Sequence, residues 1–315
     1  MKRFKLVISN DWKSDKQAHY LKKDGFLKAL HILREKEGWD TIFIKQSSPG
    51  YFDHEYVQFK YVEDVKEGIL AEKPDCILFF GDLSRPILKE FEDSKIPIAV
   101  ALTGGTFKDY AHVPDIMFVE SQVYVDMFKG DVKKVVKAFG TNTTVFKPTK
   151  QPKIWDAVFP ATFASWKRHN LFAEAMGKNG LACGWFQPNE PLCWQVCQEK
   201  GTAILHHQNA ESVSLLYNMS KTCLITSNAQ GGSQRTVLEA MACNIPVIVM
   251  SDSDKTTEYV KECGQGSIVE PDAVKMREVV WDAFGETPTT RDWIMENYSE
   301  EIYANQLKEG ILSIC

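Results

Sequence analysis

The stretch that decides the fold runs from Cys223 to Met250 and reads CLITSNAQGGSQRTVLEAMACNIPVIVM. It begins with an apolar strand, Cys223–Thr226, and a loop with two glycines then leads into a helix-forming segment, Val237–Cys243. A second apolar strand, Pro246–Met250, follows. A helix that begins shortly after a strand presents unpaired N–H groups and the positive end of its dipole, which together suit a phosphate. We therefore expect a strand–helix–strand unit that binds a phosphate-containing ligand.

Several side chains of this segment suit such a ligand. Gly231 and Gly232 allow the backbone to approach an anion closely. Ser233 can cap the helix, and Arg235 adds a permanent positive charge. Glu239 lies in an otherwise apolar stretch, where a carboxylate needs a hydrogen-bonded hydroxyl partner such as a ribose diol. The alternative is an ordinary helix with a glycine-rich entry and a partly exposed glutamate.

Short apolar runs alternate with amphipathic stretches over most of the chain, as in parallel sheets that helices cover on both faces. Two prolines and three lysines in Phe146–Lys153 disfavour both a helix and a central strand. We expect two doubly wound domains that meet there, the alternative being a surface loop of one large domain. The other predicted strands are Phe4–Ser9, Thr41–Lys45, Cys76–Phe80, Ile96–Leu102, Ile116–Glu120 and Ala157–Pro160, and the other predicted helices are Lys22–Lys36 and Ala210–Asn218.

The composition argues against several classes of protein. With 37 Lys and Arg against 42 Asp and Glu, the net charge of −5 does not favour nucleic acid as the main partner. The pair Cys193 and Cys197 lacks a second pair at zinc-site spacing, so we expect no metal. No apolar run reaches the roughly 18 residues of a membrane span, which favours a cytoplasmic protein. The four lysines of Lys129–Lys137 form either a solvated face or a peripheral contact with an anionic membrane or lipid-phosphate acceptor.

The segment Ser227–Met250 resembles the donor-binding signature of the GT-B glycosyltransferases, in particular the family 4-like group, glycosyl transferases group 1. The resemblance implies an α/β fold in which two Rossmann-like domains face a cleft. It implies an acceptor-side domain over residues 1–148, to which a C-terminal helix at about 292–315 crosses back, and a nucleotide-sugar-binding domain over residues 149–291. Similar elements of that family lie at Ala138–Pro148, Ala157–Ala175, Gln208–Tyr217 and Asn297–Leu307.

Matched residue by residue, the resemblance implies a donor site without a cofactor, the co-substrate being a UDP- or GDP-linked sugar. Lys167 would contact the diphosphate and Glu239 the ribose. The backbone around His206 would read the base. The chain also departs from the family pattern, because Thr162 stands in place of a phosphate-binding arginine, for which Arg235 or Arg168 would compensate.

Gly231 stands in place of a glutamate that contacts the donor sugar, so we expect backbone amides, Ser233, Gln234 or Arg235 to take over that contact. In the first domain, Thr103 occupies the place of a frequent histidine. The expected catalytic residues are Lys167, Arg235 and Thr103, and the expected acceptor-side residues are Asn10, Asp11, Gly104 and Gly105.

The activity that follows is transfer of a hexose from a nucleotide sugar to a glycan, lipid-linked or other acceptor, with retention of configuration and without a metal. In such a reaction the cations and amides of the protein stabilise the departing diphosphate, and no side chain has to act as a nucleophile. Two alternatives stay open. One is a non-catalytic nucleotide- or glycan-binding domain, and the other is a sugar-nucleotide epimerase or phosphorylase of the same architecture.

Overall fold

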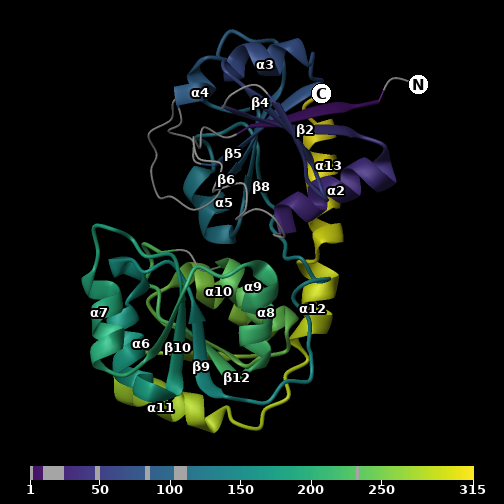
Figure 1. Cartoon of the computed structure of the whole chain (residues 1–315). Helices are drawn as coiled ribbons and strands as arrows, with labels where there is room; N and C mark the ends of the chain where they lie inside the picture. The colour runs from purple at the N-terminus through teal and green to yellow at the C-terminus, as the bar shows by residue number, and fades with distance from the viewer. Residues whose placement is uncertain (1–2, 10–24, 47–49, 82–85, 103–111, 232–233) are drawn as a thin grey trace. The chain divides into compact units, whose positions relative to one another are not determined.

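The computed structural model describes residues 3–9, 25–46, 50–81, 86–102, 112–231 and 234–315. The chain divides into two compact units, Met1–Gly140 with Glu300–Cys315, and Thr141–Ser299. Each unit is a mainly parallel sheet flanked by helices, which confirms the predicted fold class of two Rossmann-like domains (Figure 1).

The first unit contains an eight-stranded sheet in the order β3-β4-β2-β1-β5-β6-β7-β8. All neighbouring strands are parallel except β3 and β4, which pair in antiparallel fashion. The central strands are apolar on both faces, as expected of strands that helices cover on both sides. The strands are β1 Lys5–Ser9, β2 Asp40–Gln46, β3 Gly50–Asp53, β4 Gln58–Val62, β5 Cys76–Gly81, β6 Ile98–Leu102, β7 Ile116–Val119 and β8 Val135–Lys137.

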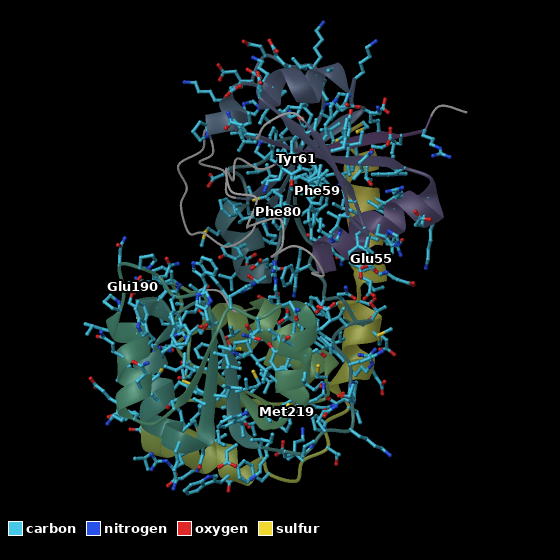
Figure 2. The ribbon with its side chains drawn as sticks, in the orientation of Figure 1. Glu55, Phe59, Tyr61, Phe80, Glu190 and Met219 are labelled. Carbon is cyan, nitrogen blue, oxygen red and sulfur yellow. The ribbon has the colours of Figure 1, made fainter. Side chains whose placement is uncertain are left out.

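Two hydrophobic cores, one on each face, hold helices against this sheet. In the core that contains residues of α2, Phe80 stacks on Phe26 with ring centroids 4.3 Å apart, and Phe59 stacks on Phe43 at 5.0 Å. Figure 2 labels Phe80 and Phe59. The core on the opposite face contains the buried side chain of Tyr124. The helices are α2 Gly25–Glu37, α3 Val65–Ala71, α4 Pro86–Lys89, α5 Gln122–Phe128 and α13 Glu300–Leu312.

The last helix, α13, belongs to the first unit, as the predicted return of the C-terminal helix requires. It packs on α2, and Leu307 and Ile311 lie in the same core as that helix. Lys36 and Glu301 form an ion pair of 2.6 Å, as do Lys308 and Glu37 at 2.5 Å. These ion pairs are largely solvent-exposed, so most of the stabilisation comes from the buried side chains.

The division between the units differs from the expected boundaries at 148 and 292. Residues 141–148 belong to the second unit, because the guanidinium of Arg291 donates hydrogen bonds to the carbonyl oxygens of Thr143 and Phe146. The backbone N–H of Thr149 donates to Asn218 Oδ1. Helix α12, Thr290–Asn297, also belongs to the second unit, since it packs on α9.

The second unit contains a six-stranded sheet in the order β11-β10-β9-β12-β13-β14, in which all neighbours are parallel. Two 3₁₀ turns, η1 and η2, flank α6. The strands are β9 Trp155–Pro160, β10 Gly180–Gly184, β11 Ala203–His206, β12 Ser220–Ile225, β13 Val247–Met250 and β14 Ser267–Val269. The helical elements are η1 Ser165–Lys167, α6 His169–Met176, η2 Gly177–Asn179, α7 Leu192–Glu199, α8 Ala210–Asn218, α9 Gln234–Ala242, α10 Asp254–Cys263 and α11 Ala273–Asp282.

Every strand named from the sequence overlaps a strand of the structure, and α8 has the predicted bounds. Strands β3, β4, β8, β10, β11 and β14 were not named from the sequence. All eight cysteines are free thiols, and five of them are buried. In the part of the chain that the structure describes, no helix is both long and apolar enough to cross a membrane.

Candidate functional site

The candidate site lies at the carboxyl edge of the second unit's sheet. Because its six strands are parallel, the loops that follow β9, β10, β11 and β12 all leave from one edge, where ligands of open α/β sheets bind. The loop after β9 carries Thr162 and Lys167, and β11 ends at His206. Gly231 follows β12, and Arg235 and Glu239 lie on α9. The topology therefore collects the predicted donor-binding residues that the structure describes.

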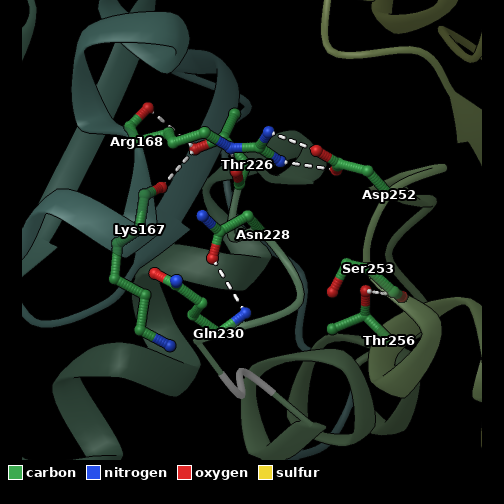
Figure 3. A network of polar contacts seen from close by, with 8 residues as sticks. All are labelled: Lys167, Arg168, Thr226, Asn228, Gln230, Asp252, Ser253 and Thr256. Atoms are coloured by element: carbon green, nitrogen blue, oxygen red, sulfur yellow. Dashed lines mark hydrogen bonds and ion pairs between the residues drawn. The ribbon is translucent and has the colours of Figure 1, made fainter.

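Lys167 is held in place by hydrogen bonds between its loop and the end of β12. The hydroxyl of Thr226 contacts two carbonyl oxygens of that loop, those of Lys167 at 2.8 Å and Arg168 at 3.1 Å. In return, Arg168 Nε donates to the carbonyl oxygen of Thr226 at 2.6 Å (Figure 3). The carboxylate of Glu190 accepts a hydrogen bond from the N–H of Ser165, at the start of η1. The half-buried Lys167 thus projects from a fixed backbone.

Arg168, one of the two arginines expected to compensate for Thr162, binds a carboxylate of the chain itself. Its guanidinium makes two hydrogen bonds to the carboxylate of Asp252, of 2.6 and 2.8 Å. Figure 3 shows this side chain extending toward Asp252, while the Lys167 side chain runs in another direction. Hydrogen bonding to Arg168 lowers the pKa of Asp252, so the carboxylate stays ionised and the bidentate pair persists. We call Arg168, Thr226 and Asp252 the Arg168 cluster.

The loop after β12 forms a compact turn around Asn228. The side-chain oxygen of Asn228 accepts from the N–H of Gln230 at 3.0 Å, and its carbonyl oxygen accepts from the N–H of Gly231 at 3.1 Å. The N–H of Asn228 donates to the carbonyl oxygen of Trp166 at 3.1 Å, which joins this turn to η1. Because the Gly231 amide is engaged within the turn, it is not the anion donor that we expected from the sequence.

Helix α9 brings a cation and a carboxylate to the same edge. The hydroxyl of Thr236 donates to the carbonyl oxygen of Pro160 at 2.9 Å, which fixes the first turn of α9 against the end of β9. Arg235, in this turn, is half-buried. Glu239 is 9% exposed, and Tyr217 donates its phenolic hydrogen to Glu239 Oε2 at 3.2 Å. Burial first, and then the charge of Glu239, raise the pKa of Tyr217, so the phenol remains a donor.

The predicted hydroxyl partner of Glu239 therefore exists within the chain. Tyr217 satisfies one oxygen of the carboxylate and holds the side chain in position. This arrangement agrees with both interpretations of the sequence, a buried structural glutamate and a carboxylate that binds a ribose.

An aromatic group surrounds the expected base-reading segment after β10 and β11. The indole of Trp185 lies 5.2 Å from the His206 ring and 5.9 Å from the His207 ring, measured between centroids. Trp185 remains 36% exposed. The preceding residue, Gly184, packs against the loop after β9, where a Cβ would lie 1.8 Å from the carbonyl oxygen of Ala161. A flat, partly exposed ring system of this kind suits a nucleotide base.

Several predicted residues lie outside the described part of the chain. They are Asn10, Asp11, Thr103, Gly104, Gly105, Gly232 and Ser233, together with the side chain of Gln234. Thr162 is half-buried directly after β9. In the described ranges, no three His, Cys, Asp or Glu side chains are grouped so that they could hold a metal ion. Five residues of the site were not predicted from the sequence: Trp166, Trp185, Tyr217, Asn228 and Asp252. Their positions shortly after strands, or beside predicted site residues, were the signal that could have indicated them.

Comparison with protein families gives a match over residues 141–282 to the model described as "Glycosyl transferases group 1". No curated protein sequence matches the chain. The matched residues cover nearly all of the second unit, including every described part of the candidate site.

Solved structures resemble the whole chain at low sequence identity. Sucrose-phosphate synthase from Thermosynechococcus elongatus has 14% identity and a TM-score of 0.75, with 98% of each chain covered. A glycosyltransferase from Rickettsia africae has 14% identity and a TM-score of 0.72, covering 100% of this chain and 99% of its own. Anabaena HepE, solved in complex with UDP and glucose, has 11% identity and a TM-score of 0.74, covering 99% of this chain and all of its own. These similarities show the GT-B fold.

Proposed function

We propose that the chain transfers a hexose from a nucleotide sugar to a glycan, lipid-linked or other acceptor, and the match of residues 141–282 to the group 1 glycosyltransferase model supports this proposal. The observation that carries this proposal is the fixed position of Lys167 beside the Asn228 turn. Thr226 and Arg168 hold the lysine backbone from one side, and the bond from Asn228 to Trp166 holds it from the other. Because the backbone of Lys167 is already fixed, the lysine can bind a diphosphate without further loss of backbone conformational freedom.

The proposed donor extends along the carboxyl edge of the second unit's sheet. Its base stacks beside Trp185 and His206, its ribose hydroxyls bind the Glu239 carboxylate, and its diphosphate binds Lys167 and Arg235. UDP is the first nucleotide to test, since HepE was solved with UDP and glucose and an E. coli trehalose-6-phosphate structure with UDP-2-fluoro glucose.

In the proposed reaction, the bond from the sugar to the nucleoside diphosphate breaks while an acceptor hydroxyl attacks the same carbon from the same face, and the hydroxyl proton passes to the departing phosphate oxygen. Charge accumulates on the departing diphosphate, so a cation fixed beside it lowers the barrier. We assign that role to Lys167 and Arg235, with retention of configuration and without a metal. The acceptor contacts expected from Thr103, Gly104, Gly105, Asn10 and Asp11 remain predictions from the sequence.

The test compares wild type with Lys167→Ala in titration calorimetry against UDP, GDP, UDP-glucose and GDP-mannose, followed by assays of sugar transfer. Loss of a hydrogen bond to a charged group costs about 1.5–3 kcal/mol, so we expect a roughly 10- to 100-fold weaker Kd. Lys178→Ala is the matched control, because Lys178 is an exposed lysine in η2, directly before β10 and thus at the amino edge of the same sheet.

Three results separate the hypotheses. Binding that Lys167→Ala weakens and Lys178→Ala does not, together with turnover, supports the transferase. The same binding pattern without transfer to any acceptor supports the non-catalytic alternative. Equal affinities for the two variants would refute the assignment of the diphosphate to Lys167.

A further inference from the structure

The indole of Trp166 lies directly against Gly231, and this contact explains why position 231 is a glycine. A Cβ built on Gly231 would lie 2.3 Å from Trp166 Cδ1, far inside van der Waals contact. The backbone of Gly231 is outside the left-handed region, so any residue could adopt its conformation. The glycine is therefore required for space, and the space is occupied by the tryptophan.

The backbone of Trp166 is fixed on both sides of the residue. Its carbonyl oxygen accepts the hydrogen bond from Asn228, and the next residue, Lys167, donates its N–H to the carbonyl oxygen of Ala164 at 2.9 Å. Even so, the side chain is 38% exposed. A large aromatic ring that is anchored in a tight turn and still open to solvent is a preformed contact surface.

The position of this ring relative to Lys167 indicates what it would contact. Trp166 and Lys167 are consecutive residues of η1 whose Cα atoms are about 3.8 Å apart, so the exposed indole and the lysine side chain start from neighbouring points of one turn. In a nucleotide sugar, the group bonded to the outer phosphate is the sugar. We propose that Trp166, seated on Gly231, is the surface on which the donor's pyranose ring stacks, an inference that rests on the proposed function.

The chemistry of an indole face defines the class of sugar. A pyranose presents C–H bonds across its ring faces, and these pack on an aromatic ring with loss of apolar surface to water. The face of the ring carries negative charge density, so it disfavours a carboxylate. Trp166 therefore selects neutral hexopyranosyl donors over hexuronosyl donors of the same nucleotide.

The experiment measures Kd by calorimetry for the full chain with UDP, UDP-glucose and UDP-glucuronate, and with GDP and GDP-mannose. Trp166→Ala should weaken binding of the neutral nucleotide sugar about tenfold, or about 1.4 kcal/mol, and change binding of the free nucleotide less than twofold. Trp166→Phe should retain most of the affinity. Trp281→Ala, which removes a tryptophan that is 51% exposed on α11, should change nothing.

The Kd of the free nucleotide also shows whether the turn around Trp166 keeps its structure in the Trp166→Ala variant. Unchanged affinity for the nucleotide sugar in this variant would overturn the inference, and so would an equal loss for the sugar nucleotide and the free nucleotide. Equal binding of UDP-glucose and UDP-glucuronate by wild type would overturn the selection. If wild type bound no nucleotide at all, the proposed function itself would fail.

Discussion

Acidification should destabilise the second unit through one buried histidine, His169. This residue is 1% exposed, and its ring stacks on Phe163 with centroids 4.2 Å apart and lies 4.9 Å from Phe159. Neither ring nitrogen makes a well-aligned hydrogen bond to the described residues, and the nearby backbone of Ala161 raises the pKa of the ring only in part. Burial, and secondly the charge of Lys167, lower the pKa of His169 to about 3. The imidazole is thus neutral throughout the physiological range.

The sign of the effect follows from where the proton binds. In the unfolded chain this histidine titrates near 6.5, and in the folded chain near 3. The stability that depends on neutral His169 is complete above about pH 6.5 and declines as the pH falls toward about 3. Because one pKa unit corresponds to about 1.4 kcal/mol, the loss at pH 5 is about 2 kcal/mol.

The assay is urea unfolding of wild type and His169→Phe at pH 7.5 and 5. Phenylalanine keeps an aromatic ring between Phe159 and Phe163 but cannot bind a proton. Between these two pH values, the variant should lose about 2 kcal/mol less unfolding free energy than wild type. His206→Phe, at an exposed position on β11, should behave like wild type. If wild type and His169→Phe lost the same free energy, His169 would not be the titrating group.

Two further predictions concern contacts within the candidate site. Arg168→Lys keeps the charge but loses the bidentate pair with Asp252. We expect the unfolding free energy of the second unit, measured in urea, to fall by about 1–2 kcal/mol and the affinity for UDP to fall several-fold. Wild-type values for both would show that the Arg168 cluster does not position Lys167. Tyr217→Phe removes one hydrogen-bond donor to the buried Glu239 and should cost about 1–3 kcal/mol of unfolding free energy, whereas an unchanged value would mean that the other contacts of this carboxylate are sufficient.

The fold was predictable because its signals are local. Buried parallel strands are continuous apolar runs, and each predicted run overlaps a strand. The boundary between units was less accessible, because it depends on contacts between distant segments. Arg291 binds backbone oxygens of Thr143 and Phe146, and this interaction attaches residues 141–148 to the second unit. A proline- and lysine-rich stretch shows that no regular element forms there, but not which unit the stretch contacts.

For the candidate site, the resemblance predicted single residues, but it did not predict which other residues contact them and hold them in position. Glu239 was identified, but its partner Tyr217 lies on another helix. Gly231 was recorded as a departure from a family pattern, and its reason is the indole of Trp166, from a different loop. A glycine in a sequence shows that a side chain is absent, and only the tertiary structure shows what occupies the space.

Arg168 shows why charge alone is a weak indicator of a ligand contact. Its backbone is left-handed, with φ 53° and ψ 48°, a conformation that costs a non-glycine residue about 1–2 kcal/mol. The side chain offsets this cost with hydrogen bonds to Thr226 and Asp252. If Arg168 left these partners for a phosphate, the cost of its backbone conformation would no longer be offset. We therefore propose that Lys167 and Arg235 carry the positive charge that faces a bound diphosphate, and we expect the affinity of the site to depend strongly on Lys167.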